Sequence, residues 1–355
     1  MGNGSGTTWQ AALALIAGVV GAGFASGREA AVFFAPFGGW GVVGVGLTAL
    51  IIAGSASRPA RRMPAPWAVL RLLLVWTTLA VILAAGGEVF RHLAGWPAIV
   101  GSTGLAALAI VAPTGVKGRQ AQGLLVGILG AAVLTVSGAA WRWGLPPLDV
   151  RASWPTLPGI SSARLPTLSG VLPAWSGSAG AARPLAALTA ALLYASYTSA
   201  LVAGEGPRER AATFKNRAYT YLGAAVIGGL LAAMSATVAR WGTLEAPLPM
   251  VAVAKGLGTW AGVGYAWLLG IAAANSAVAN AGVLSRRLAP VFGGERRARL
   301  AVTLLALAAS LLGFANLVGR VYPALGWAWL PAALGLVDGG RPWPSRADVG
   351  RRPPT

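Results

Sequence analysis

Long apolar runs separated by short polar gaps constrain this chain more than any other feature of its sequence. A helix that crosses the hydrocarbon core of a bilayer needs about 17 to 25 apolar residues, and runs near this length recur along all 355 residues. Hydrophobic residues make up 56% of the chain and charged residues 10%, which excludes an ordinary soluble domain. We therefore expect an all-α membrane protein.

The runs predict about ten transmembrane helices. The fourth and ninth are short, and barely one turn separates the ninth from the tenth. The expected spans cover residues 9–36, 39–56, 67–87, 97–112, 122–140, 184–204, 217–239, 259–285, 299–314 and 316–337.

The positive charges predict the orientation. The net charge is +19, but the basic residues lie in the gaps between apolar runs and not along one exposed face, so nucleic acid is not an expected partner. With the N-terminus in the cytoplasm, 19 of the 28 Lys and Arg residues fall on that side, as the positive-inside rule requires. Residues 1–8 lack the basic start of a signal peptide. We expect a multi-pass protein with both termini in the cytoplasm.

One long connection divides the chain into two sets of five spans. Residues 141–183 are rich in proline and tryptophan, which is typical of an extracellular loop at headgroup level. The expected units are an N-terminal tail (1–8), a first repeat (9–140), this loop, a second repeat (184–337) and a disordered cytoplasmic tail (338–355). Because five is odd, a structural repeat between the halves would be inverted.

The first span contains an unusual stretch, "GAGFASG" at Gly21–Gly27, followed by Arg28 and Glu29. Its glycines relax the backbone and favour a break in the helix. "SGRE" reads as a capping box, in which Ser26 caps a new half-helix and Glu29 reaches back to the cap. The positive end of that half-helix would be an anion site at mid-membrane.

A second interpretation stays open, because small residues in spans commonly serve close helix packing. The carboxylate favours the functional interpretation, since Glu29 is the acidic residue that falls clearly within a span and such a group is costly there. We expect Glu29 to act as a cap and support. Arg28 has three open roles: an internal pair, an anionic substrate, or a side chain that reaches outward to the interface.

The stretch "GAGFASGREAAVFFAPFG" resembles the N-terminal signature of the YkvI-like bacterial membrane proteins. Weaker likenesses follow at "ALLYASYTSALVAG", "EAPLPMVAVAKGLG" and "VYPALGWAWL", so the resemblance covers most of the chain. It implies the LeuT-type five-plus-five inverted-repeat fold of the amino acid-polyamine-organocation transporter superfamily, in a bacterial cytoplasmic membrane. Arg28 departs from the signature, where an uncharged polar residue is expected.

The resemblance also implies a substrate site, because in such transporters the first and sixth helices are broken at mid-membrane and the breaks face each other. The second break would lie near Tyr194–Ser199. The alternative is that Tyr194 and Tyr197 only pack the bundle interior. The implied substrate-binding residues are Gly21, Ala22, Gly23, Phe24, Ala25, Ser26, Gly27, Tyr194, Ser196, Tyr197 and Thr198.

Oxygen ligands for a cation occur in the eighth span, where Asn275 and Ser276 lie within an apolar run and Asn280 follows a turn later. The resemblance implies a sodium site at Gly18, Gly21, Asn275 and Ser276, with Na⁺ as a coupling ion. Interhelical hydrogen bonding is the alternative. The fifth span offers no basic side chain that could replace the ion.

The chain lacks the residues that most enzyme sites require. It has no cysteine and a single histidine, His92, so thiol nucleophiles and thiolate or histidine-pair metal sites are excluded, and no cofactor is expected. We expect a secondary transporter of a small organic solute, an amino acid or related compound, that works in the bilayer by alternating access. A small-molecule receptor subunit or a channel on the same fold remains the alternative, and the sequence leaves the oligomeric state open.

Overall fold

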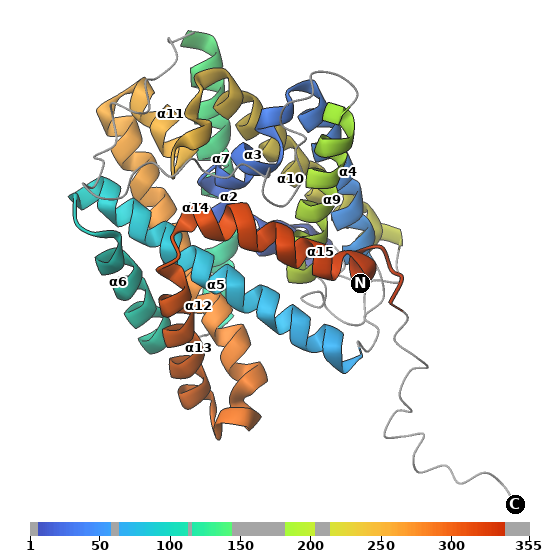
Figure 1. Cartoon of the computed structure of the whole chain (residues 1–355), viewed down its shortest axis with the longest axis vertical. Coiled ribbons are helices and arrows are strands. Elements are labelled where there is room, and N and C mark those ends of the chain that lie inside the picture. Colours follow the sequence, from blue (N-terminus) through green and yellow to red (C-terminus); the bar gives the residue numbers. More distant parts are fainter. Residues whose placement is uncertain (1–5, 58–63, 113–115, 144–181, 203–213, 338–355) are drawn as a thin grey trace, which may run out of the picture.

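The computed structural model describes residues 6–57, 64–112, 116–143, 182–202 and 214–337 (Figure 1). Helices account for nearly all of these residues, and none of them forms a strand. Most of the predicted extracellular loop and the whole predicted cytoplasmic tail lie outside the described residues, as does most of the N-terminal tail. The division into two repeats therefore stays a prediction.

The helices follow the apolar runs of the sequence. In the first half they are α1 (Gly6–Val19), α2 (Ala22–Ala25), α3 (Arg28–Phe33), the short η1 (Ala35–Phe37), α4 (Gly39–Ala56), α5 (Ala65–Ala94), α6 (Ala98–Val111) and α7 (Val116–Trp143). In the second half they are α9 (Ala182–Val202), α10 (Phe214–Trp241), η4 (Thr243–Glu245), α11 (Pro249–Leu257), α12 (Thr259–Phe292), α13 (Glu295–Ser310), α14 (Phe314–Asn316), η5 (Leu317–Val321) and α15 (Tyr322–Ala333).

Six of the described helices, α4, α5, α7, α9, α10 and α12, are long and apolar enough to cross a membrane. The chain is therefore a multi-pass membrane protein. The predicted number of ten is not confirmed, because α6 has only 14 residues, and α13 meets the following segment, Phe314–Ala333, at 95°. This bend occurs at Gly313, whose φ of 85° suits glycine.

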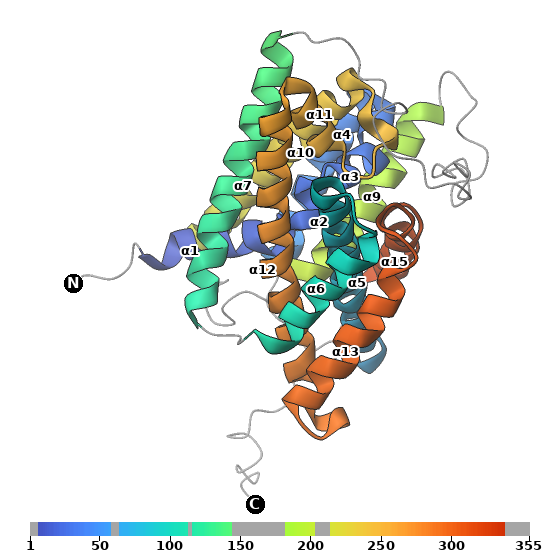
Figure 2. The ribbon, with the colours of Figure 1, turned by 90° about the vertical axis from the view of Figure 1, so that its left-hand side faces the viewer.

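The short helices α2 and α3 lie in the interior of the bundle (Figures 1 and 2). Helix α2 packs against α5 and α12, whereas α3 packs against α9, α10 and η4. Other pairs enclose them: α4 lies against α9, α5 against α12, and α15 against α9. The predicted break region is thus surrounded by protein.

Close approach of backbones holds some of these pairs together. A Cβ atom at Gly326 of α15 would lie only 2.5 Å from the carbonyl oxygen of Leu193 in α9. The same contact lets the Ser196 hydroxyl donate a hydrogen bond to the Gly326 carbonyl oxygen at 2.7 Å. Small residues at helix contacts have this effect in membrane proteins generally.

We predict that Gly326→Ala lowers the melting temperature of the purified protein, because the added methyl group pushes α15 away from α9. Overpacking of this kind costs about 1–3 kcal/mol. Gly319→Ala is the matched control, since a Cβ at Gly319 meets no atom within 4 Å. Equal melting temperatures for the two variants would contradict the prediction.

Candidate functional site

The predicted stretch Gly21–Gly27 contains two interruptions of the first helix. Helix α1 ends at Val19, and Gly21 has extended backbone angles (φ −111°, ψ −168°) before α2 begins. Helix α2 ends at Ala25, and Gly27 takes a left-handed conformation, φ 79°, before α3 begins. The depth of these interruptions in a bilayer stays a prediction.

Long-range hydrogen bonds satisfy the backbone at the second interruption. The carbonyl oxygen of Ala25 accepts a bond from the Tyr265 hydroxyl of α12 at 2.7 Å. The carbonyl oxygen of Ser26 accepts one from the backbone N–H of Met250 in α11 at 3.0 Å. Non-helical backbone at membrane depth is tolerated only where protein or water satisfies it. Helices α11 and α12 therefore stabilise the turn between α2 and α3.

The predicted capping box does not form, because the N-cap of α3 is Gly27 and not Ser26. The Ser26 hydroxyl accepts a hydrogen bond from the backbone N–H of Arg28 at 3.1 Å and donates one to the carbonyl oxygen of Gly23 at 2.6 Å. Glu29 does not reach back to Ser26, because its carboxylate accepts a hydrogen bond from Tyr194 instead. Helix α3 has only six residues, and Ser26 already occupies its first N–H, so the predicted anion site at this helix start has little support.

Glu29 is closely packed between the interrupted helix and α9. Its side chain is 7% exposed, and the Tyr194 hydroxyl donates to its Oε2 at 2.6 Å. The other carboxylate oxygen would lie 3.0 Å from a Cβ at Gly23. The Tyr194 ring packs against the rings of Phe33 and Phe34, with centroids 5.2 and 5.3 Å away. Sequence-distant residues thus meet at one buried carboxylate.

A second tyrosine contact lies one turn further along α9. The hydroxyls of Tyr197 and Thr78 are hydrogen-bonded at 2.5 Å, and the Tyr197 ring stacks on Tyr322 with centroids 3.8 Å apart. Neither Thr78 nor Tyr322 is among the site residues predicted from the sequence. Tyr322 belongs to "VYPALGWAWL", whereas nothing in the sequence around Thr78 distinguishes it from a residue that only packs.

Arg28 is bound inside the protein. Its side chain is 4% exposed, and its Nη1 donates to the carbonyl oxygens of Leu244 at 2.8 Å and Ala246 at 3.3 Å. Its Nε is buried and has no hydrogen-bond partner among the described residues. Of the three open roles, the outward-reaching side chain is wrong, and the internal contact is the one observed.

The predicted break at Tyr194–Ser199 is wrong, because α9 is continuous from Ala182 to Val202. The helix contains no glycine or interior proline there to favour a break. Its hydroxyls support the helix instead: Ser199 bonds to the carbonyl oxygen of Ser196 at 2.7 Å. Tyr194, Ser196, Tyr197 and Thr198 are all buried. Tyr194 reaches Glu29 beside the break, whereas Ser196 is directed to Gly326 of α15 and Tyr197 to Thr78 of α5.

The predicted sodium ligands come from α1, the first interruption and α12. A Cβ at Gly21 would lie 3.4 Å from the Ser276 hydroxyl, so these two residues are neighbours. The carbonyl oxygen of Ser276 accepts a hydrogen bond from the Asn280 side chain at 2.9 Å. Gly18 and Asn275 are half-buried. Sodium binding at Gly18, Gly21, Asn275 and Ser276 stays a prediction.

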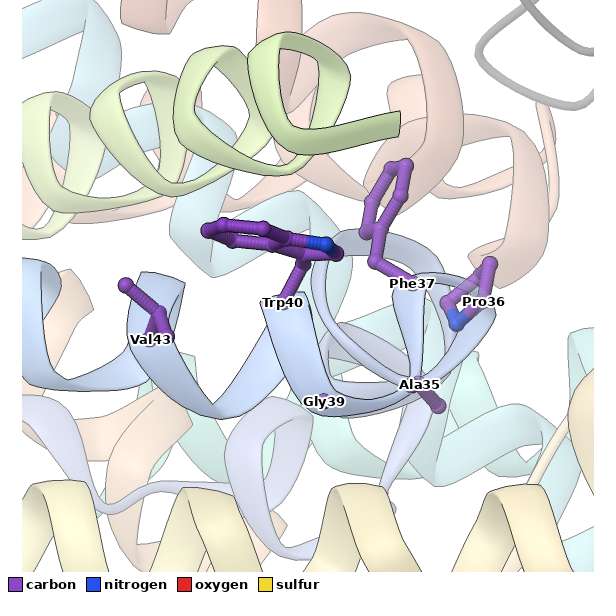
Figure 3. Close-up of a pocket in the computed structure, with 7 residues that line it drawn as sticks. Ala35, Pro36, Phe37, Gly39, Trp40 and Val43 are labelled. Atoms are coloured by element: carbon purple, nitrogen blue, oxygen red, sulfur yellow. The ribbon is translucent and has the colours of Figure 1, made fainter. Parts of the chain in front are cut away.

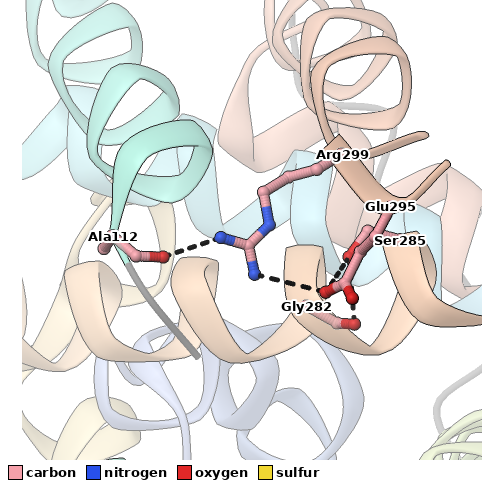
Figure 4. A network of polar contacts seen from close by, with 5 residues as sticks. All are labelled: Ala112, Gly282, Ser285, Glu295 and Arg299. Atoms are coloured by element: carbon pink, nitrogen blue, oxygen red, sulfur yellow. Dashed lines mark hydrogen bonds and ion pairs between the residues drawn. The ribbon is translucent and has the colours of Figure 1, made fainter. Parts of the chain in front are cut away.

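Two other features lie apart from the break. An open pocket of about 810 Å³ occurs where η1 meets α4, and Phe37, Trp40 and Val43 line it (Figure 3). The second feature is a polar network around Arg299 of α13 (Figure 4). Arg299 donates a hydrogen bond to the carbonyl oxygen of Ala112, just after α6, at 2.7 Å and forms an ion pair with Glu295 at 3.9 Å. Glu295 also accepts a hydrogen bond from the Ser285 hydroxyl of α12. Neither feature was predicted from the sequence.

Solved structures resemble the chain in overall shape. It is similar to MhsT in complex with L-phenylalanine, with a TM-score of 0.49 and 14% sequence identity over 92% of this chain and 88% of that one. It is also similar to two mutants of the Eremococcus coleocola manganese transporter, each with a TM-score of 0.46 and 14% identity over 95% of this chain and 80% of that one. No family model and no curated protein matches the chain. These likenesses assign no function to it.

We predict that Tyr194→Phe destabilises the protein, because it leaves the buried Glu29 carboxylate without its hydroxyl donor. Loss of one partner of a buried hydrogen bond costs about 1–3 kcal/mol. The measurement is thermal unfolding in detergent, with Tyr221→Phe as the control, since Tyr221 is 48% exposed. If both variants unfolded at the wild-type temperature, the Tyr194–Glu29 hydrogen bond would not contribute to stability, and the prediction would be wrong.

Proposed function

We propose that this chain is a secondary transporter of a small organic solute in the bacterial cytoplasmic membrane, with both termini in the cytoplasm. The observation that carries the proposal is the interrupted first helix, whose segments α2 and α3 lie in the interior of the bundle (Figure 2). Polar contacts to three other helices surround it: Tyr194 of α9, Met250 of α11 and Tyr265 of α12.

The cost of this arrangement supports a functional role. Helix packing alone is satisfied by glycines in a regular helix, as at Gly326. Here the chain also gives up regular helix bonds and buries both Arg28 and Glu29, which is expensive in apolar surroundings. Transporter sites are commonly built from discontinuous helices. The resemblance of "GAGFASGREAAVFFAPFG" to the YkvI-like signature agrees with this interpretation.

The proposed solute is an amino acid or a related compound. The proposed substrate-binding residues are those of the break, Gly21–Gly27, together with Tyr194, Ser196, Tyr197 and Thr198 of α9. Backbone carbonyl groups near Ala22 would accept hydrogen bonds from an ammonium group once the break opens and releases them from their present donors. The continuity of α9 changes one detail, because α9 would contribute side chains and not an unwound backbone. In alternating access, the interrupted helix and its neighbours rock against the rest of the bundle.

The proposal predicts that a substrate raises the melting temperature of the purified protein, because a ligand that binds only the folded state stabilises it. The screen uses amino acids, amines and organic acids, each with sodium or choline as the salt. A concentration 100 times the Kd stabilises by about 2.7 kcal/mol. Sodium dependence of the response would support the proposed ligands Gly18, Gly21, Asn275 and Ser276.

Three variants test where the solute and the ion bind. Gly23→Leu crowds the Glu29 carboxylate, because even a Cβ at Gly23 would lie 3.0 Å from its oxygen, and it should abolish the response. Ser276→Ala should remove the sodium dependence of the response. Gly264→Leu is the matched control, because Gly264 is exposed on α12 and a Cβ there meets no atom within 4 Å. If no compound stabilises the wild-type protein, the small-solute proposal fails. A receptor subunit that needs a partner then becomes the better hypothesis.

A further inference from the structure

The buried carboxylate of Glu29 has a role that a structural contact alone does not explain. We propose that Glu29 binds a proton in one conformation of the transport cycle and releases it in another. This inference rests on the proposed function, because it assigns a coupled cation to the same region. It is separate from the predicted sodium site, whose side chains belong to α12.

No described residue of opposite charge neutralises Glu29. No Lys, Arg or His of the described residues forms an ion pair with it. The adjacent Arg28 is directed elsewhere, to the carbonyl oxygens of Leu244 and Ala246. An isolated carboxylate is costly to bury, and proteins commonly avoid this cost by neutralising the group. A bound proton removes the charge without a counter-ion.

The titratable groups that face Glu29 are neutral phenols. Tyr194 and Tyr197 of α9 and Tyr322 of α15 interact with it electrostatically. Phenols donate hydrogen bonds but supply no positive charge. The other elements packed against α3 also carry ionisable residues, and none of them forms an ion pair with Glu29. Among the described residues these are Arg217, Tyr219, Tyr221 and Arg240 of α10, Glu245 of η4, Lys255 of α11 and Arg320 of η5. Glu245 interacts with Arg28 instead.

The packing around Glu29 suits a proton better than a larger cation. One carboxylate oxygen lies against Gly23 and the other is bonded to Tyr194. The Tyr194 ring is itself held by Phe33 and Phe34. A proton adds to the free oxygen without moving any of these groups. An ammonium group of a solute would first have to displace Tyr194 or open the break.

The position of Glu29 couples its protonation to movement. Its hydrogen bond joins α3, part of the interrupted helix, to α9. Rocking of one element against the other breaks this bond and changes the surroundings of the carboxyl group. A group whose surroundings differ between two conformations binds protons differently in each, and proton binding then shifts the balance between them.

The test uses the proton itself as the probe. Infrared difference spectra between acidic and alkaline pH are recorded on the full-length protein reconstituted in lipid. Every carboxyl group that titrates contributes a C=O stretch to this difference spectrum, and the chain has nine Asp and Glu residues. The wild-type spectrum should contain one component that is missing from the spectrum of Glu29→Gln. Glu88→Gln is the matched control, because Glu88 is also in a spanning helix but pairs with Arg91. Tyr194→Phe should shift the frequency of the band, since it removes the hydrogen bond to that carboxyl group.

A second measurement separates a proton carrier from a carboxyl group that merely titrates. The chain has no cysteine, so Thr198→Cys introduces a single thiol on α9, at a buried position one turn from Tyr194. The rate of alkylation of this thiol is divided by the rate for the denatured protein at the same pH, which removes the effect of pH on the thiol itself. This ratio should change by about fivefold or more between acidic and alkaline pH, because the coupling between two binding events in a protein is typically at least this large. In the double variant Thr198→Cys, Glu29→Gln, the ratio should stay at every pH at the value that Thr198→Cys alone has at acidic pH, because Gln is neutral like a protonated Glu.

Each result decides the proposal. A band that depends on Glu29, together with pH-dependent alkylation that Glu29→Gln abolishes, supports it. Identical infrared spectra for wild type and Glu29→Gln would overturn it. It would also be overturned if the infrared spectra showed that Glu29 titrates but the alkylation ratio did not change with pH. These measurements need no solute. If Glu29 behaves as proposed but no solute binds, the transporter proposal fails while the proton site stands.

Discussion

The interrupted first helix depends on one constraint, which is that unwound backbone in an apolar setting must find hydrogen-bond partners within the protein. Tyr265 and Met250 supply two of these partners to the carbonyl oxygens of Ala25 and Ser26. Both come from the second half of the chain, more than 200 residues away in sequence. The turn between α2 and α3 can therefore form only when α11 and α12 are in place.

The same dependence explains why the buried polar residues gather at this point. Once α3 is separated from α1, its first residues face the interior, where Arg28 reaches the backbone at η4 and Glu29 reaches Tyr194. Each contact joins the interrupted helix to a different element.

Some of this arrangement could be predicted from the sequence. Apolar run length indicated the helices, and the glycines of "GAGFASG" together with Arg28 and Glu29 indicated the interrupted region. The partner of Glu29 was missed, because a capping box is a local pattern and Tyr194 is 165 residues away. The break expected in α9 came from the resemblance and lacked any glycine to support it. Thr78 and the backbone contacts of Arg28 carry no signal in the sequence, since they depend on how distant helices pack.

The most direct test of the account is accumulation of a stabilising solute in proteoliposomes against its own gradient. The account predicts saturable uptake that is driven by a cation gradient, lost in Gly23→Leu and kept in Gly264→Leu. A solute that stabilises the protein but never crosses the membrane would contradict it, and would indicate a receptor. Uptake that only equilibrates the solute, whatever the gradient, would contradict it too and would indicate a channel.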